Sequence, residues 1–331
     1  MENPTILITG GAGYIGTHTV LALQEAGYSV LILDNLVYGH RDLVEKVLKA
    51  ELICGNICDR PLLDQIFAQR SIEAVIHFAA YTYVNESVSD PLKYYQTNVL
   101  GSLTLLEAML QAEVNKIVFS STCATYGIPQ QIPIPEEHPQ NPINPYGATK
   151  LMVEKILLDF DRAYQLRSVC FRYFNAAGAD KLGRLGEDRT PETHLIPLVL
   201  LTALGKREKV FIFGTDYDTP DGTCIRDYIH VIDLAHAHVL GLNYLLQGGE
   251  TEIFNLGNGN GFSVQQVIDT VINITKRSFP VVKTERRTGD PPILVGNYEK
   301  VQRVLGWKPA YSKLEEMIED AWRWHQRRHS D

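Results

Sequence analysis

Two side chains of one short segment have the types and spacing of an acid–base pair. Residues 144–150 read Asn-Pro-Tyr-Gly-Ala-Thr-Lys. Asn144 suits the N-cap of a helix and Pro145 its first turn. Tyr146 and Lys150 would then share one helix face, where an ammonium and the helix N-terminus both favour an ionised phenol. We therefore expect the pKa of Tyr146 to fall from about 10 toward neutrality, which would make Tyr146 a base.

A glycine-rich turn near the start of the chain predicts a dinucleotide partner for that base. An apolar run over 5–9 leads directly into Gly10, Gly13 and Gly16, and after a helical stretch a second apolar run ends at Asp34. The glycines would let a diphosphate approach the backbone at a helix N-terminus. Asp34 stands at the spacing of a ribose ligand and would repel a 2′-phosphate, so we expect NAD rather than NADP.

Alternation of short apolar runs with helical stretches continues along the chain, and predicts an α/β, doubly wound parallel sheet of the Rossmann type. Further strands are expected over 51–54, 74–78, 116–121 and 168–172, and helices over 61–69, 91–112 and 145–164. Loops and short elements follow Asn175. We expect an NAD-binding domain over 1–175 and about 226–247, and a smaller α/β domain that holds the substrate over about 176–225 and 248–331.

Composition limits the classes of function. The chain has 331 residues, of which 45% are hydrophobic and 21% charged, as in globular proteins. The net charge of −8, without a long basic run, argues against nucleic acid as a partner. Neither a membrane span nor an apolar leader is recognisable. The five scattered cysteines indicate reduced thiols, a cytoplasmic location and no metal site.

Five motifs occur in a fixed order along the chain: Gly10-x-x-Gly13-x-x-Gly16, Ser120-Ser121-Thr122, Tyr146-x-x-x-Lys150, Arg172-Tyr173-Phe174-Asn175 and Arg226-Asp227-Tyr228-Ile229-His230-Val231. Together they resemble the extended short-chain dehydrogenase/reductase family. The resemblance extends from Ile6 to about Trp324. Within the family it is strongest to the enzymes that use NAD to invert C4 of a UDP-sugar such as UDP-glucose or UDP-galactose.

The resemblance implies roles for individual residues. Tyr146 would take the proton of the sugar 4-hydroxyl, Thr122 would hydrogen-bond the same hydroxyl, and Lys150 would hold the nicotinamide ribose. The residues implied to contact NAD are Gly10, Gly13, Tyr14, Ile15, Gly16, Asp34, Asn35, Asn56, Ile57, Phe78, Ala79, Ala80, Asn98, Tyr146, Lys150 and Tyr173. The residues implied to contact the UDP-sugar are Thr122, Tyr146, Asn175, His194, Leu195, Phe211, Phe213, Arg226, Arg287, Asp290 and Leu294.

Three positions depart from the pattern of the family. Asn56 stands where close members often have an aspartate against the adenine amino group. Thr82 stands where some members have a lysine near the cofactor, so NAD would be held more loosely. Leu294 stands where some members have a tyrosine beside the sugar, so the pocket would be roomier and would admit an N-acetyl group.

Several alternatives remain open from the sequence. Related dehydratases and decarboxylases carry an acid directly after the catalytic Ser/Thr, whereas Cys123 follows Thr122 here. A dehydrogenase would use the same three residues and release NADH. The preferred sugar could be UDP-N-acetylglucosamine or UDP-xylose, and a non-catalytic NAD-binding regulatory protein is the alternative from another class. The resemblance also suggests a homodimer formed through the helices expected over 91–112 and 145–164.

Overall fold

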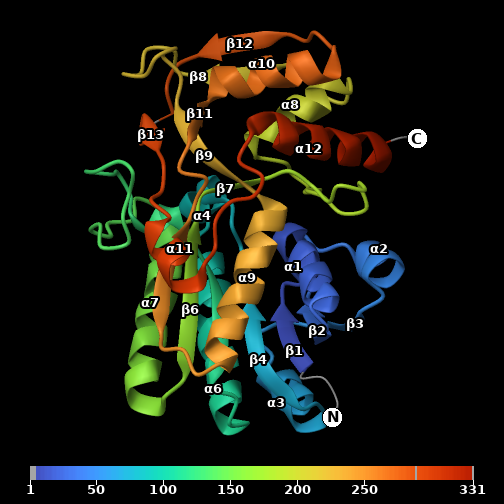
Figure 1. Cartoon of the computed structure of the whole chain (residues 1–331), viewed down its shortest axis with the longest axis vertical. Helices are drawn as coiled ribbons and strands as arrows, with labels where there is room; N and C mark the ends of the chain where they lie inside the picture. Colours follow the sequence, from blue (N-terminus) through green and yellow to red (C-terminus); the bar gives the residue numbers. More distant parts are fainter. Residues whose placement is uncertain (1–4, 288, 330–331) are drawn as a thin grey trace.

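The computed structural model of the chain describes residues 5–287 and 289–329. Its larger part is a seven-stranded parallel sheet in the order β10-β6-β5-β4-β1-β2-β3, which confirms the predicted doubly wound fold (Figure 1). The strands are β1 (Thr5–Thr9), β2 (Ser29–Asp34), β3 (Glu51–Cys54), β4 (Ile72–His77), β5 (Lys116–Thr122), β6 (Arg167–Tyr173) and β10 (Glu252–Leu256). The central strands are continuous apolar runs because helices cover both faces.

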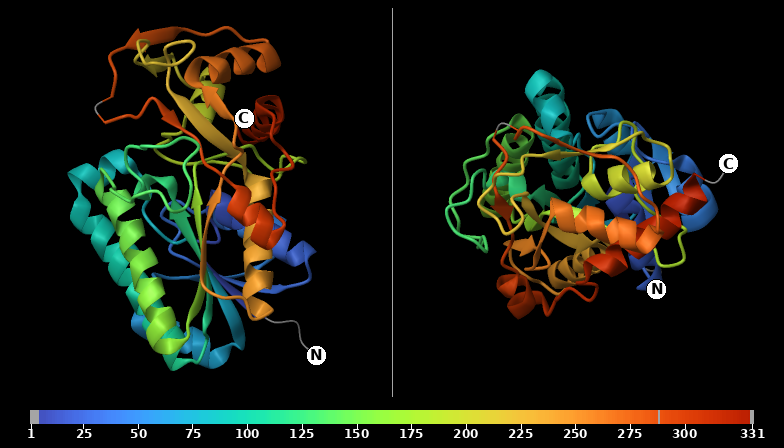
Figure 2. Two further views of the ribbon diagram at one scale, coloured as in Figure 1. Left: turned by 60° about the vertical axis from the view of Figure 1, so that its left-hand side comes forward. Right: turned by 90° about the horizontal axis from the view of Figure 1, so that it is seen from above.

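Two sets of helices cover the sheet (Figures 1 and 2). Helices α1 (Tyr14–Glu25) and α9 (Val231–Leu246) share a buried apolar core with one face. Helices α3 (Arg60–Gln69), α6 (Gly101–Gln111) and α7 (Pro145–Tyr164) share another with the opposite face. Both cores consist of buried apolar side chains, so burial of apolar surface fixes both layers.

The helix expected over 91–112 is present but is not uniformly α-helical. It consists of α5 (Pro91–Tyr94), a π-helical segment (Tyr95–Leu100) and α6. Asp90 caps its start by accepting a hydrogen bond from the backbone N–H of Lys93. The remaining short helices of the larger part are α2 (Arg41–Leu43), a π-helical segment (Val44–Leu48), α4 (Val84–Ser89) and a 3-10 turn (Cys123–Thr125).

The smaller part lies over the carboxyl ends of the strands of the large sheet, at the top of Figure 1. Strands β7 and β11 both pair with β9, which also pairs with β13, while β8 and β12 form a separate pair. The strands are β7 (Asn175–Ala177), β8 (Val210–Phe213), β9 (Ile225–His230), β11 (Gly261–Ser263), β12 (Val281–Thr284) and β13 (Ile293–Leu294). Helices α8 (Leu195–Ala203), α10 (Val264–Thr275) and α12 (Leu314–Arg328) share the core of the smaller part, whereas α11 (Glu299–Leu305) packs on the core of the larger one.

The structure moves two of the expected domain boundaries. The segment expected to return to the larger domain at about 226 begins with β9, which belongs to the smaller sheet, and only α9 rejoins the larger one. After α9 the chain does not leave at 247, because β10 pairs with β6 at the edge of the large sheet. The reason is topological: α9 is the crossover helix that a parallel edge strand requires.

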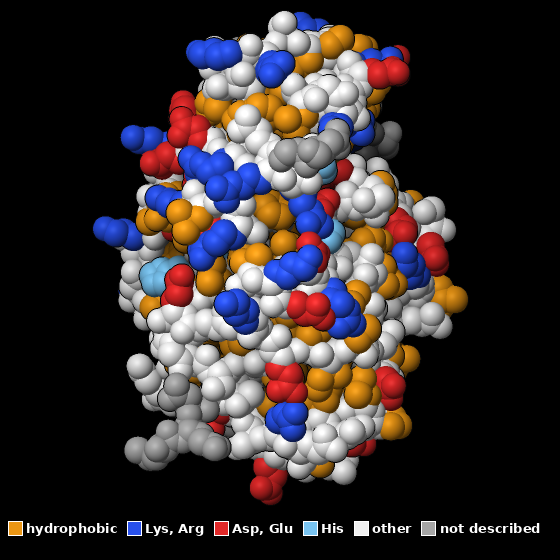
Figure 3. Space-filling model, turned by 90° about the vertical axis from the view of Figure 1, so that its right-hand side faces the viewer, with side chains coloured by type: hydrophobic (Ala, Val, Ile, Leu, Met, Phe, Trp, Pro, Cys, Tyr) orange, Lys and Arg blue, Asp and Glu red, His pale blue; other side chains and the backbone are white. Residues whose placement is uncertain are grey.

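The surface shown in Figure 3 carries Lys and Arg side chains intermixed with Asp and Glu. Within the residues that the structure describes, every helix is too short or too polar to span a bilayer.

One buried ion pair ties α7 to the sheet. Arg172 of β6 donates from Nη2 to Oε2 of Glu154 at 2.7 Å and from Nε to Oε1 at 3.0 Å. Ser121 of β5 also donates to this carboxylate, and Arg172 Nη1 donates to Tyr126 Oη at 2.9 Å. The two side chains of the pair are only 4% and 2% exposed. The pair therefore fixes the N-terminal half of α7 against β5 and β6.

Removal of one partner from this pair should destabilise the fold strongly. We expect Glu154→Ala to lower the free energy of unfolding by about 3–5 kcal/mol, because Arg172 would keep a buried charge without its counter-ion. Asp159→Ala is the matched control on the same helix, since Asp159 forms an exposed pair with Arg162, and should change it by less than about 1 kcal/mol. Urea denaturation measures both values; equal values for the two variants would contradict the assignment.

Candidate active site

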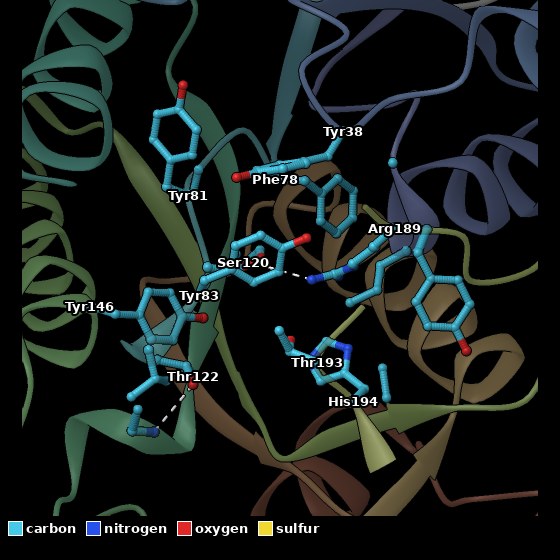
Figure 4. Close-up of a pocket in the computed structure, with 18 of the residues that line it drawn as sticks. Tyr38, Phe78, Tyr81, Tyr83, Ser120, Thr122, Tyr146, Arg189, Thr193 and His194 are labelled. Atoms are coloured by element: carbon cyan, nitrogen blue, oxygen red, sulfur yellow. Dashed lines mark hydrogen bonds between the residues drawn. The ribbon is translucent and has the colours of Figure 1, made fainter. Parts of the chain in front are cut away.

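A cavity of about 800 Å³ lies between the carboxyl ends of the large sheet and the smaller part. It runs from the glycine-rich turn, past the end of β5 and the start of α7, to side chains of the smaller part (Figure 4). This is the edge at which parallel α/β sheets bind ligands. Its walls come from segments far apart in the sequence, so the fold as a whole builds the site.

The glycine-rich turn has room for a ligand and for no side chain. Gly10 has φ +73°, and a Cβ there would lie 2.6 Å from the backbone nitrogen of Ala79. A Cβ at Gly16 would lie 2.4 Å from the carbonyl oxygen of Gly10. Helix α1 begins directly after Gly13, which has no side chain to cap it. Backbone N–H groups of the first turn are therefore available to a diphosphate, as NAD requires.

Asp34 closes the opposite side of this turn at the end of β2. Its Oδ2 accepts a hydrogen bond from the backbone N–H of Ala12 at 3.0 Å and its Oδ1 from Leu36 at 2.8 Å. Burial raises the pKa of Asp34, and these hydrogen bonds act against that rise. The carboxylate lines the cavity together with Asn35 and Asn56. An acceptor that cannot donate in its ionised form fits a ribose diol and disfavours a phosphate.

The proposed base lies at the start of α7, as the sequence predicts. Asn144 Oδ1 accepts a hydrogen bond from the backbone N–H of Gly147 at 2.8 Å, which confirms the predicted N-cap. Tyr146 is half-buried and lines the cavity. Thr122 ends β5 and accepts a hydrogen bond from the backbone N–H of Ala124 at 3.2 Å (Figure 4), and its side chain is also hydrogen-bonded to Tyr146. Two hydroxyl groups thus face one ligand space.

The electrostatic expectation for Tyr146 is wrong for the protein by itself. Burial raises the pKa of Tyr146 well above its usual range, and the hydrogen bond from Thr122 only reduces that rise. Burial also lowers the pKa of Lys150 to about 7, so the side chain that was expected to be a cation loses much of its charge near neutral pH. Lys150 is 3% exposed, and its Nζ donates to the carbonyl oxygen of Ser120 at 2.7 Å. Desolvation is the largest cause of both shifts.

Most of the residues implied by the family resemblance meet at this cavity. Those that line it are Gly10, Gly13, Tyr14, Ile15, Gly16, Asp34, Asn35, Asn56, Ile57, Phe78, Ala79, Ala80, Thr122, Tyr146, Tyr173, Asn175, His194, Arg226, Arg287, Asp290 and Leu294. Lys150 and Asn98 lie behind the wall. Asn98 accepts from the backbone N–H of Tyr81 at 2.9 Å and donates to its carbonyl at 3.0 Å, so it shapes the loop after β4.

The other three predicted residues line a second cavity of about 280 Å³, which shares a wall with the first. They are Leu195, Phe211 and Phe213. At the shared wall, Arg226 Nη2 lies 2.7 Å from Asp290 Oδ1, and the guanidinium of Arg287 lies 3.8 Å from the centre of the Phe213 ring. Two guanidinium groups beside two aromatic rings form a suitable place for a nucleoside diphosphate.

The sequence reasoning missed several residues of the cavity wall. Tyr38 and Tyr83 line it, with ring centres 5.0 Å apart. The aromatic repeat directly after the β4 strand was the available signal. Arg189 also lines the cavity, from a segment that the sequence indicated only as a loop.

One group of possible metal ligands gathers at the cavity among the described residues: Glu187, Glu192 and His194. Their ligand atoms already have partners. His194 Nδ1 lies 2.6 Å from Glu187 Oε1, and Glu192 Oε1 accepts from the backbone N–H groups of Thr193 and His194. These contacts are those of a hydrogen-bonded loop.

Comparison with known proteins agrees with this geometry. The chain matches the model of the NAD dependent epimerase/dehydratase family over residues 6–257. It is 56% identical to a protein of Halalkalibacterium halodurans named UDP-glucose 4-epimerase, over 97% of this chain and 95% of that protein. A Rhizobium meliloti protein of the same name is 52% identical over 99% of each chain. The crystal structure of UDP-glucose 4-epimerase from Brucella ovis in complex with NAD has a TM-score of 0.94 and 46% identity, covering 96% of this chain and 97% of that one.

The lowered pKa of Lys150 predicts a pH-dependent cost in stability. Between about pH 7 and 10 the unfolded chain binds a proton that folded Lys150 releases, so the free energy of unfolding rises with pH in this window. Relative to Lys150→Met, the parent should therefore gain up to about 4 kcal/mol from pH 7 to 10, at about 1.4 kcal/mol per pKa unit. Urea denaturation at several pH values measures the difference. Lys155→Met, at an exposed position of the same helix, should give a flat difference; a flat result for Lys150→Met would disprove the prediction.

Proposed function

Because the chain belongs to the NAD dependent epimerase/dehydratase family, we propose that it interconverts UDP-glucose and UDP-galactose by NAD-dependent epimerisation at C4. It is an isomerase that uses NAD as its cofactor. The observation that carries the choice of reaction is that Thr122 and Tyr146 face the same cavity as the glycine-rich turn and Asp34. A hydroxyl-bearing carbon held there would meet a base and a hydride acceptor together.

The roles of the chain's own residues follow from their positions. Tyr146 takes the proton from the sugar 4-hydroxyl and later returns it, while Thr122 hydrogen-bonds the same oxygen. NAD, when bound, would supply the acceptor and later the donor of the C4 hydride. Arg226 and Arg287 hold the diphosphate of the substrate while the sugar turns about its link to that diphosphate. Lys150, which donates to the carbonyl oxygen of Ser120, would hold the nicotinamide ribose.

The two parts of the molecule would divide the ligands between them. We assign NAD to the larger part, because the glycine-rich turn and Asp34 both belong to its sheet. The uridine end of the substrate falls to the smaller part, where Phe211 and Phe213 line the second cavity. Tyr146 and Thr122 lie at the junction, so the sugar is held between the two parts.

The function is tested by turnover without added cofactor. The purified protein should convert UDP-galactose into UDP-glucose with NAD already bound and without accumulation of NADH, because the hydride leaves and returns. Tyr146→Phe should lower this turnover by about 100-fold or more while NAD stays bound. Tyr164→Phe, at an exposed position of the same helix, is the matched control and should leave turnover unchanged. Stoichiometric NADH would indicate a dehydrogenase, and full activity of Tyr146→Phe would remove Tyr146 from its role.

The alternative substrate is UDP-N-acetylglucosamine, and Leu294 is the observation that favours it. Leu294 lines the main cavity and packs its side chain against Tyr126 and Phe174. A leucine turned partly into this apolar cluster leaves more space near the sugar than a tyrosine would. UDP-xylose, which lacks the C6 group, would also fit such a space.

Leu294→Tyr tests this alternative directly. The larger side chain should reduce turnover of UDP-N-acetylglucosamine about 5- to 150-fold more than that of UDP-glucose, because a clash with the N-acetyl group costs about 1–3 kcal/mol. Leu294→Met keeps the volume and should affect neither substrate selectively. Parallel kcat/KM measurements decide the matter. An equal effect on both sugars, or a parent protein without activity on the N-acetylated one, would rule the alternative out.

The assembly and the setting of the protein follow as further parts of the proposal. Apolar side chains are exposed along α4, α5, the adjoining π-helical segment and α7: Val88, Leu92, Tyr95, Leu100 and Met152. These helices lie side by side in Figure 2, and a homodimer would cover them; light scattering measures its mass.

Exposed free thiols at Cys54 and Cys58 suit the reducing cytoplasm, where galactose metabolism would supply the substrate, and cell fractionation tests this location.

A further inference from the structure

A loop between β7 and α8 carries an arginine into the cavity. The loop is fastened at two places: Trp324 Nε1 donates to the carbonyl oxygen of Glu187 at 2.9 Å, and Tyr83 Oη donates to that of Pro191 at 2.8 Å. Arg189 lies between these two anchors, and its side chain is 18% exposed. Figure 4 shows it pointing into the pocket. The two anchors therefore fix the backbone on both sides of Arg189 and hold its side chain at the cavity.

The contacts of Arg189 leave most of its hydrogen-bonding capacity for a ligand. Its Nε lies 3.2 Å from Glu187 Oε1, and its Nη1 donates to Thr82 Oγ1 at 3.2 Å. A guanidinium carries five N–H donors, so these two partners in the described part of the chain engage a minority of them. Glu187 also accepts from His194 at 2.6 Å. One carboxylate oxygen of Glu187 is thus shared between the guanidinium of Arg189 and the ring of His194.

The location of Arg189 is in the cofactor half of the cavity. Thr82 lies in the loop that follows β4, directly beyond Ala79 and Ala80, which face the glycine-rich turn. Burial raises the pKa of Tyr146 and Tyr173, and the positive charge of Arg189 acts against both rises. The guanidinium is therefore close to the phenol at one end and to the cofactor loop at the other.

Arg189 is the cation among the described residues that line this half of the cavity; of the two acids next to it in the chain, Glu187 is its own partner and Asp188 is paired with Arg328. Among the described lining residues, Arg226 and Arg287 lie at the far end with Asp290 and the second cavity. Asp34, at the near end, is an acid. A dinucleotide that lies from Asp34 to Tyr146 would place its two phosphate charges beside the glycine-rich turn. Arg189 is the side chain positioned to neutralise those charges.

We propose that Arg189 binds the diphosphate of NAD and provides the cation that a lysine at position 82 would otherwise supply. This assignment rests on the proposed function, because it takes NAD as the bound dinucleotide. A planar guanidinium forms paired hydrogen bonds to phosphate oxygens and is always charged. Glu187 and Thr82 orient it, one on each side. The threonine at 82 therefore accepts a hydrogen bond from the cation that replaces the lysine, and NAD is not held loosely.

Retention of NAD by the purified protein tests the assignment without any turnover. Bound NAD per protomer and its half-life during dialysis are measured for the parent and for Arg189→Ala. We expect NAD to leave the variant about 10-fold faster or more, as for a lost hydrogen bond to a charged group. Arg184→Ala is the matched control, because Arg184 lies in the same loop and pairs with Asp180. It should retain NAD like the parent.

Further variants separate the possible results. Thr82→Lys introduced into Arg189→Ala should restore retention, because it returns a cation to the same place. Arg189→Gln, which keeps hydrogen bonds but not the charge, replaces Arg189→Ala if the latter does not fold. Retention within about 2-fold of the parent in Arg189→Ala or Arg189→Gln, or a loss of UDP affinity in them with NAD retention unchanged, would overturn the assignment alone. A parent that binds no NAD would overturn the proposed function with it.

Discussion

The position of α7 against the sheet depends on one buried ion pair. Glu154 of α7 meets Arg172 of β6, and Ser121 of β5 donates to the same carboxylate. A charge buried this deeply costs several kcal/mol unless it is paired, so the helix cannot slide or roll without that penalty. Tyr146 lies about two helical turns before Glu154. The pair therefore decides where the phenol stands relative to Thr122 at the end of β5, and the geometry of the site follows from it.

Local signals and buried strands made the larger part predictable. Strands whose two faces are covered appear as continuous apolar runs, and caps such as Asn144 are read from one residue and its neighbours. The glycine-rich turn was also predictable from the sequence, because a close backbone contact such as that of Gly10 with Ala79 leaves no room for a side chain and so requires glycine. The edge strand β10 was missed as part of the large sheet, since its pairing with β6 joins segments that are far apart in the chain.

What could not be predicted depends on burial and on distant contacts. The spacing of Tyr146 and Lys150 correctly places both on one helix, but not the depth at which Lys150 is buried, and that depth lowers its pKa to about 7. Arg189 gave no signal, because its partner Thr82 belongs to another loop that only the folded chain brings near. Neither residue pattern nor composition contains these distances.

The same burial explains how a phenol with a raised pKa can still serve as a base. Desolvation penalises the charged form of Tyr146, but it also lowers the local dielectric, in which every charge nearby acts more strongly. The positive charge of Arg189 already acts against the rise. Any further cation that binds beside Tyr146 acts in that same medium and favours its ionisation. The site thus keeps Tyr146 protonated by default and couples its ionisation to the charges of whatever binds in the cavity.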